Sequence, residues 1–179
     1  MSTLKFAVNS ADHHRGNVNA TITLVEYGDF QCPYCRRAHG LVDLLLTEKG
    51  QELHFVFRNF PLREIHPLAF SAAAAAEAAG KQDKFWEMYD RLYENQPKIT
   101  SRFLLSLAEE IGLDLQQFDG DSMSEEIRLK IESDFNGGIR SGVNGTPTFF
   151  LNGVRVSSYD ETYDSLLNVF LAESELQRQ

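Results

Sequence analysis

The two cysteines of this chain, Cys32 and Cys35, are the only ones among its 179 residues, and they lie three positions apart. An apolar segment rich in β-branched residues, 21–27, precedes them, and an amphipathic helical pattern that ends near Gly50 follows them. A second apolar run occupies residues 53–57. A strand, a helix of about four turns and a strand form a βαβ unit, so the sequence predicts two parallel strands joined by a right-handed crossover.

The middle of the chain has a different character. Strand signals are absent between residues 62 and 138, where apolar residues recur at helical spacing. Strand character returns at residues 148–151, and Asn152-Gly153 before residues 154–156 is typical of an antiparallel hairpin. A final helical pattern follows. The sequence therefore predicts an α/β fold with a mixed central sheet of about four strands, in the order βαβ then ββα, interrupted by an all-helical insertion.

Length and composition allow one domain with a sizeable insertion. Apolar residues make up 42% of the chain, enough for a hydrophobic core without disulfides or metals. The α/β domain is predicted to be discontinuous, comprising residues 1–61 and 139–179, with residues 62–138 as the helical insertion.

Capping-box patterns mark two helix starts. In each, a serine is followed three residues later by a glutamate, so that the two side chains can satisfy free amides of the first turn. The pairs are Ser122 with Glu125 and Ser158 with Glu161.

Charge and the N-terminal segment restrict the partners. Acidic residues outnumber basic ones 26 to 17, for a net charge of −9, without a Lys/Arg cluster, which argues against nucleic acid. The first ten residues lack the apolar core of a secretory signal, and no stretch is long enough to span a bilayer. We therefore expect a cytoplasmic protein without a membrane partner, where thiols rest reduced. An exported protein whose signal had been removed would look the same.

The spacing of the two thiols indicates chemistry rather than a structural staple. A disulfide that closes so short a loop stabilises the fold little, because its entropic effect grows with loop length. Free amides at a helix start favour a thiolate there, and Pro33 suits the first turn because it lacks an N–H. Cys32, at the end more exposed to substrate, is the predicted nucleophile. Cys35, one turn inside, is the predicted resolving thiol that releases a mixed disulfide.

Two other interpretations use the same thiols. Cys32, Cys35 and His39 match a zinc-ligand spacing, but a structural zinc site needs four ligands and there is no second cysteine pair. His66, His13 or His14 would have to complete it. An inert, buried thiol pair is the second alternative, and the helix start argues against it. No metal is expected.

Glu26 is the only charged residue in the first predicted strand. Alternation places its carboxylate on the same face as Ile22 and Leu24, inside a strand expected to be covered on both sides. A buried carboxylate without a partner has a raised pKa and can accept a proton from Cys35. Pairing with an Arg or Lys, or a position at a sheet edge, is equally compatible with the periodicity.

Two segments together resemble the DsbA-like thioredoxin-fold oxidoreductases. They are residues 23–35, TLVEYGDFQCPYC, and residues 142–153, GVNGTPTFFLNG. The stretch from His66-Pro67 to Trp86-Glu87 is also similar to the helical insertion of that family. The resemblance covers nearly the whole chain after about Ser10, and a Cys-x-x-Cys pair in a βαβ unit is itself a thioredoxin-like motif. It implies a thioredoxin fold split by a helical domain.

The resemblance also implies roles for single residues. X-Pro bonds are mostly trans, so the sequence pattern alone does not assign a cis bond at Thr146-Pro147. The family pattern implies that Pro147 is cis and faces the cysteines, and that the Thr146 backbone pairs with an extended substrate peptide. It further implies that Glu26 relays protons. No cofactor is expected beyond the cysteine pair, with glutathione or another thiol as a candidate electron partner.

Two positions depart from the DsbA pattern. Pro33-Tyr34 stands between the cysteines, where DsbA has a histidine at the second position that stabilises the thiolate by its charge. Thr146 replaces the valine usual before the proline and is similar to the disulfide isomerases. Both differences predict a protein that is less oxidising than DsbA.

The sequence thus predicts a thiol–disulfide oxidoreductase that acts through a mixed disulfide. Its expected partners are a thiol- or disulfide-containing protein or small molecule and a separate redox partner. A redox-sensitive binding or chaperone-like module, and a glutathione-dependent isomerase or transferase on the same fold, are the alternatives. Whether the pair makes, breaks or shuffles disulfides depends on its potential relative to the compartment.

Overall fold

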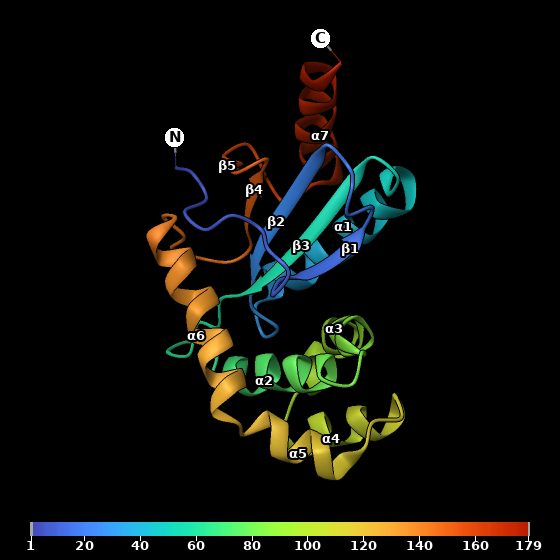
Figure 1. Ribbon diagram of the computed structural model, residues 1–179, viewed down its shortest axis with the longest axis vertical. Helices are drawn as coiled ribbons and strands as arrows, with labels where there is room; N and C mark the ends of the chain where they lie inside the picture. The colour runs from blue at the N-terminus through green and yellow to red at the C-terminus, as the bar shows by residue number, and fades with distance from the viewer. Residues whose placement is uncertain (1, 179) are drawn as a thin grey trace.

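A mixed sheet forms the centre of the computed structural model, which describes residues 2–178. Within this range the sheet has five strands in the order β1-β3-β2-β4-β5 (Figure 1). Helix α1 (Pro33–Lys49) connects the parallel strands β2 (Ile22–Gly28) and β3 (Leu53–Asn59). Strand β4 (Thr148–Leu151) runs antiparallel to β2, and β5 (Val154–Arg155) antiparallel to β4. The predicted α/β fold, with its βαβ and ββα parts, is confirmed.

The helical insertion lies between β3 and β4 and gathers beyond one end of the sheet (Figure 1). Its elements are α2 (Ala69–Gly80), α3 (Phe85–Glu94), the 3-10 turn η1 (Gln96–Lys98), α4 (Ser101–Glu110), α5 (Leu115–Ser122) and α6 (Glu125–Arg140). Helix α6 continues past residue 138 and brings the chain back to the sheet. The division at residues 62–138 stays a prediction, and α6 crosses its second boundary without a break.

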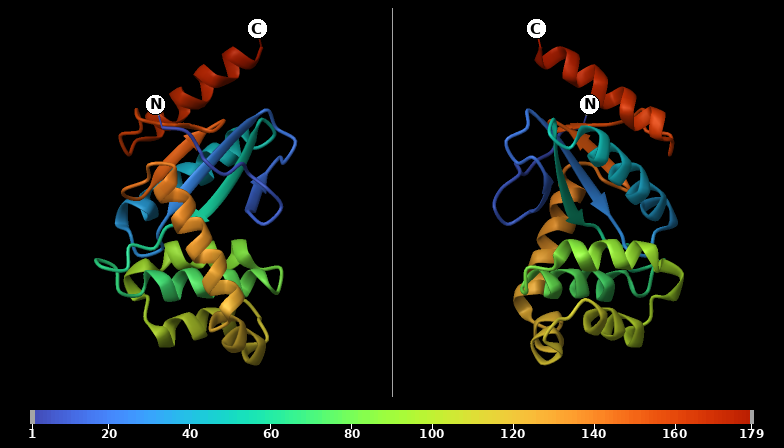
Figure 2. Two further views of the ribbon diagram at one scale, coloured as in Figure 1. Left: turned by 60° about the vertical axis from the view of Figure 1, so that its left-hand side comes forward. Right: turned by 90° about the vertical axis from the view of Figure 1, so that its right-hand side faces the viewer.

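Helices cover both faces of the sheet (Figure 2). Helix α1 lies with the C-terminal helix α7 (Tyr163–Gln177) on one side, and α6 packs on the other. On the α6 side, a methyl group built at Gly138 would lie 2.7 Å from the Phe60 ring, so only glycine permits this approach. The central strand β2 is therefore enclosed, which explains why its residues from Leu24 to Gly28 are all buried.

Strand β1 (His13–Gly16) is the element that the sequence pattern does not predict. It pairs antiparallel with β3, with His13 opposite Phe57. Its sequence, HHRG, contains no β-branched residue, and contacts from the insertion hold it instead. The Trp86 indole donates a hydrogen bond to the His14 carbonyl at 2.8 Å, and the His13 imidazole lies 2.9 Å from the Glu77 carboxylate.

Both predicted capping pairs are wrong. Helix α5 continues through Ser122, and the cap of α6 is Ser124, whose hydroxyl accepts from the Ile127 amide at 3.3 Å. Helix α7 is capped by Thr162, which accepts from the Ser165 amide at 3.2 Å. The sequence contains several candidate caps close together, and packing selects among them.

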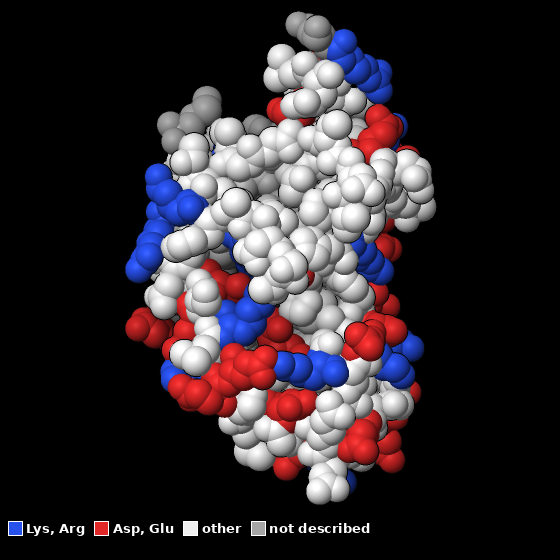
Figure 3. Space-filling view, in the orientation of Figure 1, with Lys and Arg blue, Asp and Glu red and all other residues white. Residues whose placement is uncertain are grey.

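The surface carries its charges unevenly. On the face seen in Figure 3, charged side chains of both signs gather over the helical insertion, whereas much of the surface over the sheet is uncharged. No helix in the described range combines the length and apolar character needed to cross a membrane.

Candidate active site

The two sulfurs lie at the first turn of α1. Cys32 is the N-cap residue with an extended backbone, φ −72° and ψ 121°, and Pro33 occupies the first helical turn. Both cysteines are free. Cys32 is less exposed than the sequence suggests, because only 3% of its surface is accessible, against 0% for Cys35. The more accessible sulfur is still the one at the helix start.

The environment separates the acidities of the two thiols. The pKa of Cys32 is lowered from 9.0 to about 6, first by a hydrogen bond from Cys35 and further by Thr146 and the backbone N–H groups of the first turn; burial opposes the shift. The pKa of Cys35 is raised well above its ordinary value, first by burial and then by its hydrogen bond to Cys32. At neutral pH this site therefore holds one thiolate, at Cys32, and one thiol, at Cys35.

The Thr146-Pro147 segment faces Cys32. The peptide bond between these two residues is cis, and the Thr146 carbonyl oxygen lies 3.3 Å from the Cys32 sulfur, from which it accepts a hydrogen bond when Cys32 is protonated. The Thr146 hydroxyl is buried and has no hydrogen-bond partner among residues 2–178. The segment before β4 thus meets the start of α1, although 114 positions separate the two residues in the sequence.

Glu26 lies in the centre of the sheet, opposite Phe57 of β3 and Phe149 of β4. It is 0% exposed, and neither carboxylate oxygen has a hydrogen-bond partner among the described residues. Burial, followed by the negative charge of Cys32, raises its pKa from 4.5 to about 8. The structure thereby decides between the alternatives that the periodicity left open: Glu26 is neither ion-paired nor at a sheet edge.

Asp29 is a residue of this site for which the sequence suggested no role. Its buried carboxylate accepts from the Gln31 amide at 2.7 Å, from the Leu62 amide at 2.9 Å and from the His66 imidazole at 2.8 Å. Its own amide donates to the Cys35 sulfur at 3.4 Å. Asp29 therefore joins the loop before the cysteines to the loop after β3. The position of Asp29 between the strand and the thiols can be recognised in the sequence. Its partners Leu62 and His66 cannot, because they are distant in the sequence.

The histidines considered as zinc ligands are engaged elsewhere. His39 lies 3.0 Å from the Asp90 carboxylate, and His66 contacts Asp29. Within the described part of the chain, no group of three or more His, Cys, Asp or Glu side chains is arranged to hold a metal ion.

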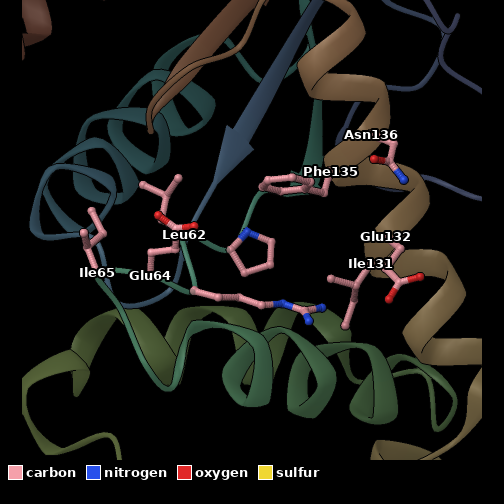
Figure 4. Close-up of a pocket in the computed structure, with 9 residues that line it drawn as sticks. Leu62, Glu64, Ile65, Ile131, Glu132, Phe135 and Asn136 are labelled. Atoms are coloured by element: carbon pink, nitrogen blue, oxygen red, sulfur yellow. The ribbon is translucent and has the colours of Figure 1, made fainter.

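Two surface pockets lie near these elements. A pocket of about 400 Å³ is lined by Pro147, Phe149, Arg155 and Tyr159, next to the cis peptide bond. A larger one, of about 590 Å³, lies between residues 61–65 and α6, where Figure 4 shows Leu62 and Ile65 on one wall and Ile131 and Phe135 on the other. The cysteines line neither pocket, but the smaller one includes Pro147, whose neighbour Thr146 contacts Cys32, so it is the candidate substrate groove.

The position of the helical insertion, between β3 and β4, distinguishes this architecture from a plain thioredoxin fold and gives the chain the fold of DsbA-like proteins. The chain belongs to the thioredoxin family, whose sequence model matches residues 8–169.

Solved structures agree with this assignment. The chain is similar to a thioredoxin-like oxidoreductase from Silicibacter pomeroyi DSS-3, with 28% identity, a TM-score of 0.79, and coverage of 93% of this chain and 94% of that one. It shares its fold with oxidised BdbD from Bacillus subtilis, at 22% identity and a TM-score of 0.82, covering 96% and 97% of the two chains.

A curated relative carries a different name. The Na(+)/H(+) antiporter NhaA 1 of Salinispora arenicola is 46% identical over 144 residues, which is 80% of this chain but 22% of the antiporter. The chain thus spans less than a quarter of that relative's length, and most of the antiporter lies outside the match.

The acidity of Cys32 leads to a first prediction. Alkylation of the reduced protein by iodoacetamide is expected to follow a titration midpoint near pH 6, because only the thiolate reacts. Mass spectrometry should place the modification on Cys32, with Cys35 unreacted at neutral pH. In a Cys35→Ala variant the midpoint should rise, since the main hydrogen-bond donor is lost. A wild-type midpoint near that of free cysteine, about 8.5, would contradict this description of the site.

Proposed function

We propose that this protein is a thiol–disulfide oxidoreductase that cycles Cys32 and Cys35 between a dithiol and a disulfide. The observation that carries the proposal is the pair of free cysteines one turn apart at the start of α1, with Thr146-Pro147 facing the first of them. The pKa shifts, down to about 6 for Cys32 and upward for Cys35, agree with this geometry. A nucleophilic thiolate beside a protonated thiol is the arrangement that two-step disulfide exchange requires.

In the first step the Cys32 thiolate attacks one sulfur of a substrate disulfide. A bond forms between Cys32 Sγ and that sulfur, the substrate S–S bond breaks, and the other substrate sulfur leaves as a thiolate that takes a proton from water. In this proposal the Thr146 backbone, which lies beside Cys32, pairs with an extended substrate peptide, and the pocket next to Pro147 receives a substrate side chain.

In the second step Cys35 loses its proton and attacks Cys32 Sγ. The Cys32–Cys35 disulfide forms, the mixed disulfide breaks, and the first substrate sulfur leaves as a thiolate. The substrate gains two electrons and the protein loses two. A dithiol or thiol partner, with glutathione as the candidate, returns the pair to its reduced state, and the reverse sequence oxidises a substrate.

Glu26 suits the role of proton acceptor for Cys35 because its charge state responds to Cys32. The negative charge of the Cys32 thiolate is one of the two causes that raise the pKa of Glu26. Once Cys32 is in a mixed disulfide that charge is gone, so the pKa of Glu26 falls, although burial, the larger cause, still holds it above its ordinary value. Glu26 is thus more easily ionised at the step in which Cys35 must lose its proton.

The direction of the reaction follows from how strongly the thiolate is stabilised. A Cys32 pKa of about 6 lies between the values of about 7 for thioredoxin and about 3.5 for DsbA. Tyr34 is 52% exposed and brings no positive charge to the sulfur. We therefore propose a protein less oxidising than DsbA, which in a cytoplasm poised by glutathione would act mainly on incoming disulfides.

Equilibration with glutathione tests this function. The protein is incubated with defined ratios of reduced to oxidised glutathione, quenched with acid, and its dithiol and disulfide forms are quantified by mass spectrometry. We expect reversible interconversion with a potential in the glutaredoxin range, about −200 to −230 mV. A potential near −120 mV, that of DsbA, would contradict the weaker oxidising power. A pair that never forms an intramolecular disulfide would contradict the function itself.

A further inference from the structure

Gln96 connects the helical insertion to the backbone that carries the nucleophile. It is the first residue of η1, and its side-chain Nε2 donates to the Phe30 carbonyl at 2.8 Å and to the Cys32 carbonyl at 2.9 Å. A primary amide has two N–H donors, so both are used. The two bonds bracket the short segment that leads from β2 into α1.

Neither carbonyl is an arbitrary acceptor. Phe30 is 1% exposed and lies outside the helices and strands, so its buried carbonyl needs a donor from elsewhere. The Cys32 carbonyl already accepts the first helical bond, from the Arg36 amide at 3.1 Å. The Gln96 amide is thus an additional donor at the N-terminus of α1, where partial positive charge acts on the Cys32 sulfur.

The end of α3 holds Gln96 in this position. Tyr93 packs its ring against Phe30 with centroids 5.0 Å apart, and the Tyr89 ring meets Phe30 edge-on at 5.8 Å. Asn95, directly before Gln96, donates from its side chain to the Arg91 carbonyl at 3.1 Å. The insertion therefore presents the amide from a packed helix end.

We propose that Gln96 is a positioning residue through which the helical insertion holds the backbone on either side of Gln31 and keeps the Cys32 sulfur reactive. The redox consequence rests on the proposed function, whereas the consequence for thiol reactivity does not.

The direction of the effect follows from charge. Gln96 donates to the Phe30 and Cys32 carbonyls and not to the sulfur, so it acts indirectly: its hydrogens offset the negative potential of those carbonyl oxygens beside the helix start, and removing them makes Cys32 less acidic. Thiolate stabilisation also favours the dithiol over the disulfide form. Loss of the Gln96 donors should therefore make the protein a weaker oxidant.

Three substitutions separate donation from simple packing. Gln96→Leu removes the donors, Gln96→Glu replaces them with acceptors and a negative charge, and Gln96→Lys restores N–H donors with a positive charge. The matched control is Gln82→Leu. The Gln82 side chain also makes two hydrogen bonds to backbone, but within the insertion: it accepts from the Asp114 amide at 2.9 Å and donates to the Asp114 carbonyl at 3.1 Å.

The alkylation midpoint and the glutathione equilibrium are the two readouts. We expect the Cys32 midpoint to rise by about 0.5–1 pH unit in Gln96→Leu and further in Gln96→Glu, and to stay at or below the wild-type value in Gln96→Lys. The glutathione equilibrium of Gln96→Leu should shift about threefold to tenfold toward the disulfide, or about 14–30 mV at 29.6 mV per decade. Gln82→Leu should change neither readout, whatever its effect on the melting temperature.

Several results would overturn the proposal. If Gln96→Leu lowered only the melting temperature and left the alkylation profile unchanged, Gln96 would be a packing residue. If the Gln96→Leu variant did not fold, equal alkylation midpoints for Gln96→Glu and Gln96→Lys would contradict the proposal just as clearly. If the wild type formed no disulfide with glutathione, the proposed function would fail, while the alkylation series would still decide the role of Gln96.

Discussion

Cys32→Ser is expected to lower turnover of a disulfide substrate by at least about 10³-fold, whereas Cys35→Ser is expected to accumulate a mixed disulfide. A serine hydroxyl is not ionised near neutral pH and cannot replace the thiolate that attacks the substrate. Cys35→Ser keeps that attack but removes the sulfur that releases the product. The two variants therefore fail at different steps, although their substitutions are chemically the same.

Both failures can be observed with one substrate, a peptide closed by a disulfide. Release of peptide thiols gives the turnover rate, and mass spectrometry under non-reducing, acid-quenched conditions detects a peptide joined to Cys32. Ser106→Ala, on the exposed surface of α4, serves as the control and should behave as wild type. Undiminished turnover by Cys32→Ser would remove Cys32 as nucleophile. A mixed disulfide on Cys35 in the wild type would reverse the two roles.

Glu26→Gln is expected to stabilise the reduced protein by about 4 kcal/mol at pH 8.5 and to have little effect at pH 4.5. The pKa of Glu26 is about 8 in the folded protein, against an ordinary value of 4.5. Between these pH values the folded state keeps a proton that the unfolded state releases, so the wild type loses stability as the pH rises. Because glutamine does not titrate, the variant does not lose stability in this way as the pH rises.

Urea unfolding at pH 4.5, 6, 7 and 8.5 under reducing conditions measures the difference. The stability gap between variant and wild type should widen steadily from pH 4.5 toward pH 8, while Glu109→Gln, an exposed carboxylate on α4, should show no such trend. A gap that does not depend on pH would mean that Glu26 is not protonated at neutrality.

The same Glu26→Gln variant should slow release of the mixed disulfide at pH 7, because Cys35 loses its proton acceptor.

The parts of the fold that local patterns specify were predictable. Strands β2, β3 and β4 are apolar runs, and the Asn152-Gly153 turn requires a backbone with positive φ, which it has at both positions, 45° and 81°. Strand β1 was not predictable, because its polar sequence is held by Trp86 and Glu77 from the insertion. The helix caps were missed for a related reason: several candidates compete locally, and tertiary packing selects one.

The candidate site divides in the same way. Cys32, Cys35, Glu26, Thr146 and Pro147 were all named from sequence, and the structure brings them together. Asp29 and Gln96 were not, since each acts through partners distant in the sequence, such as the Leu62 amide or the Cys32 carbonyl. A side chain that hydrogen-bonds to a backbone group can have any residue type as its partner. No sequence pattern therefore predicts such a contact.

The sequence by itself determined that two sulfurs stand one turn apart at a helix start, because helix capping and the Cys-x-x-Cys spacing are local properties of the chain. Only the tertiary structure decided how acidic each sulfur is and that the Glu26 carboxylate has no hydrogen-bond partner within residues 2–178. A pKa depends on which groups surround an atom and how much water reaches it, and here those groups come from as far away as Thr146. The local sequence therefore specifies which reactive groups are present, and the fold specifies how reactive they are.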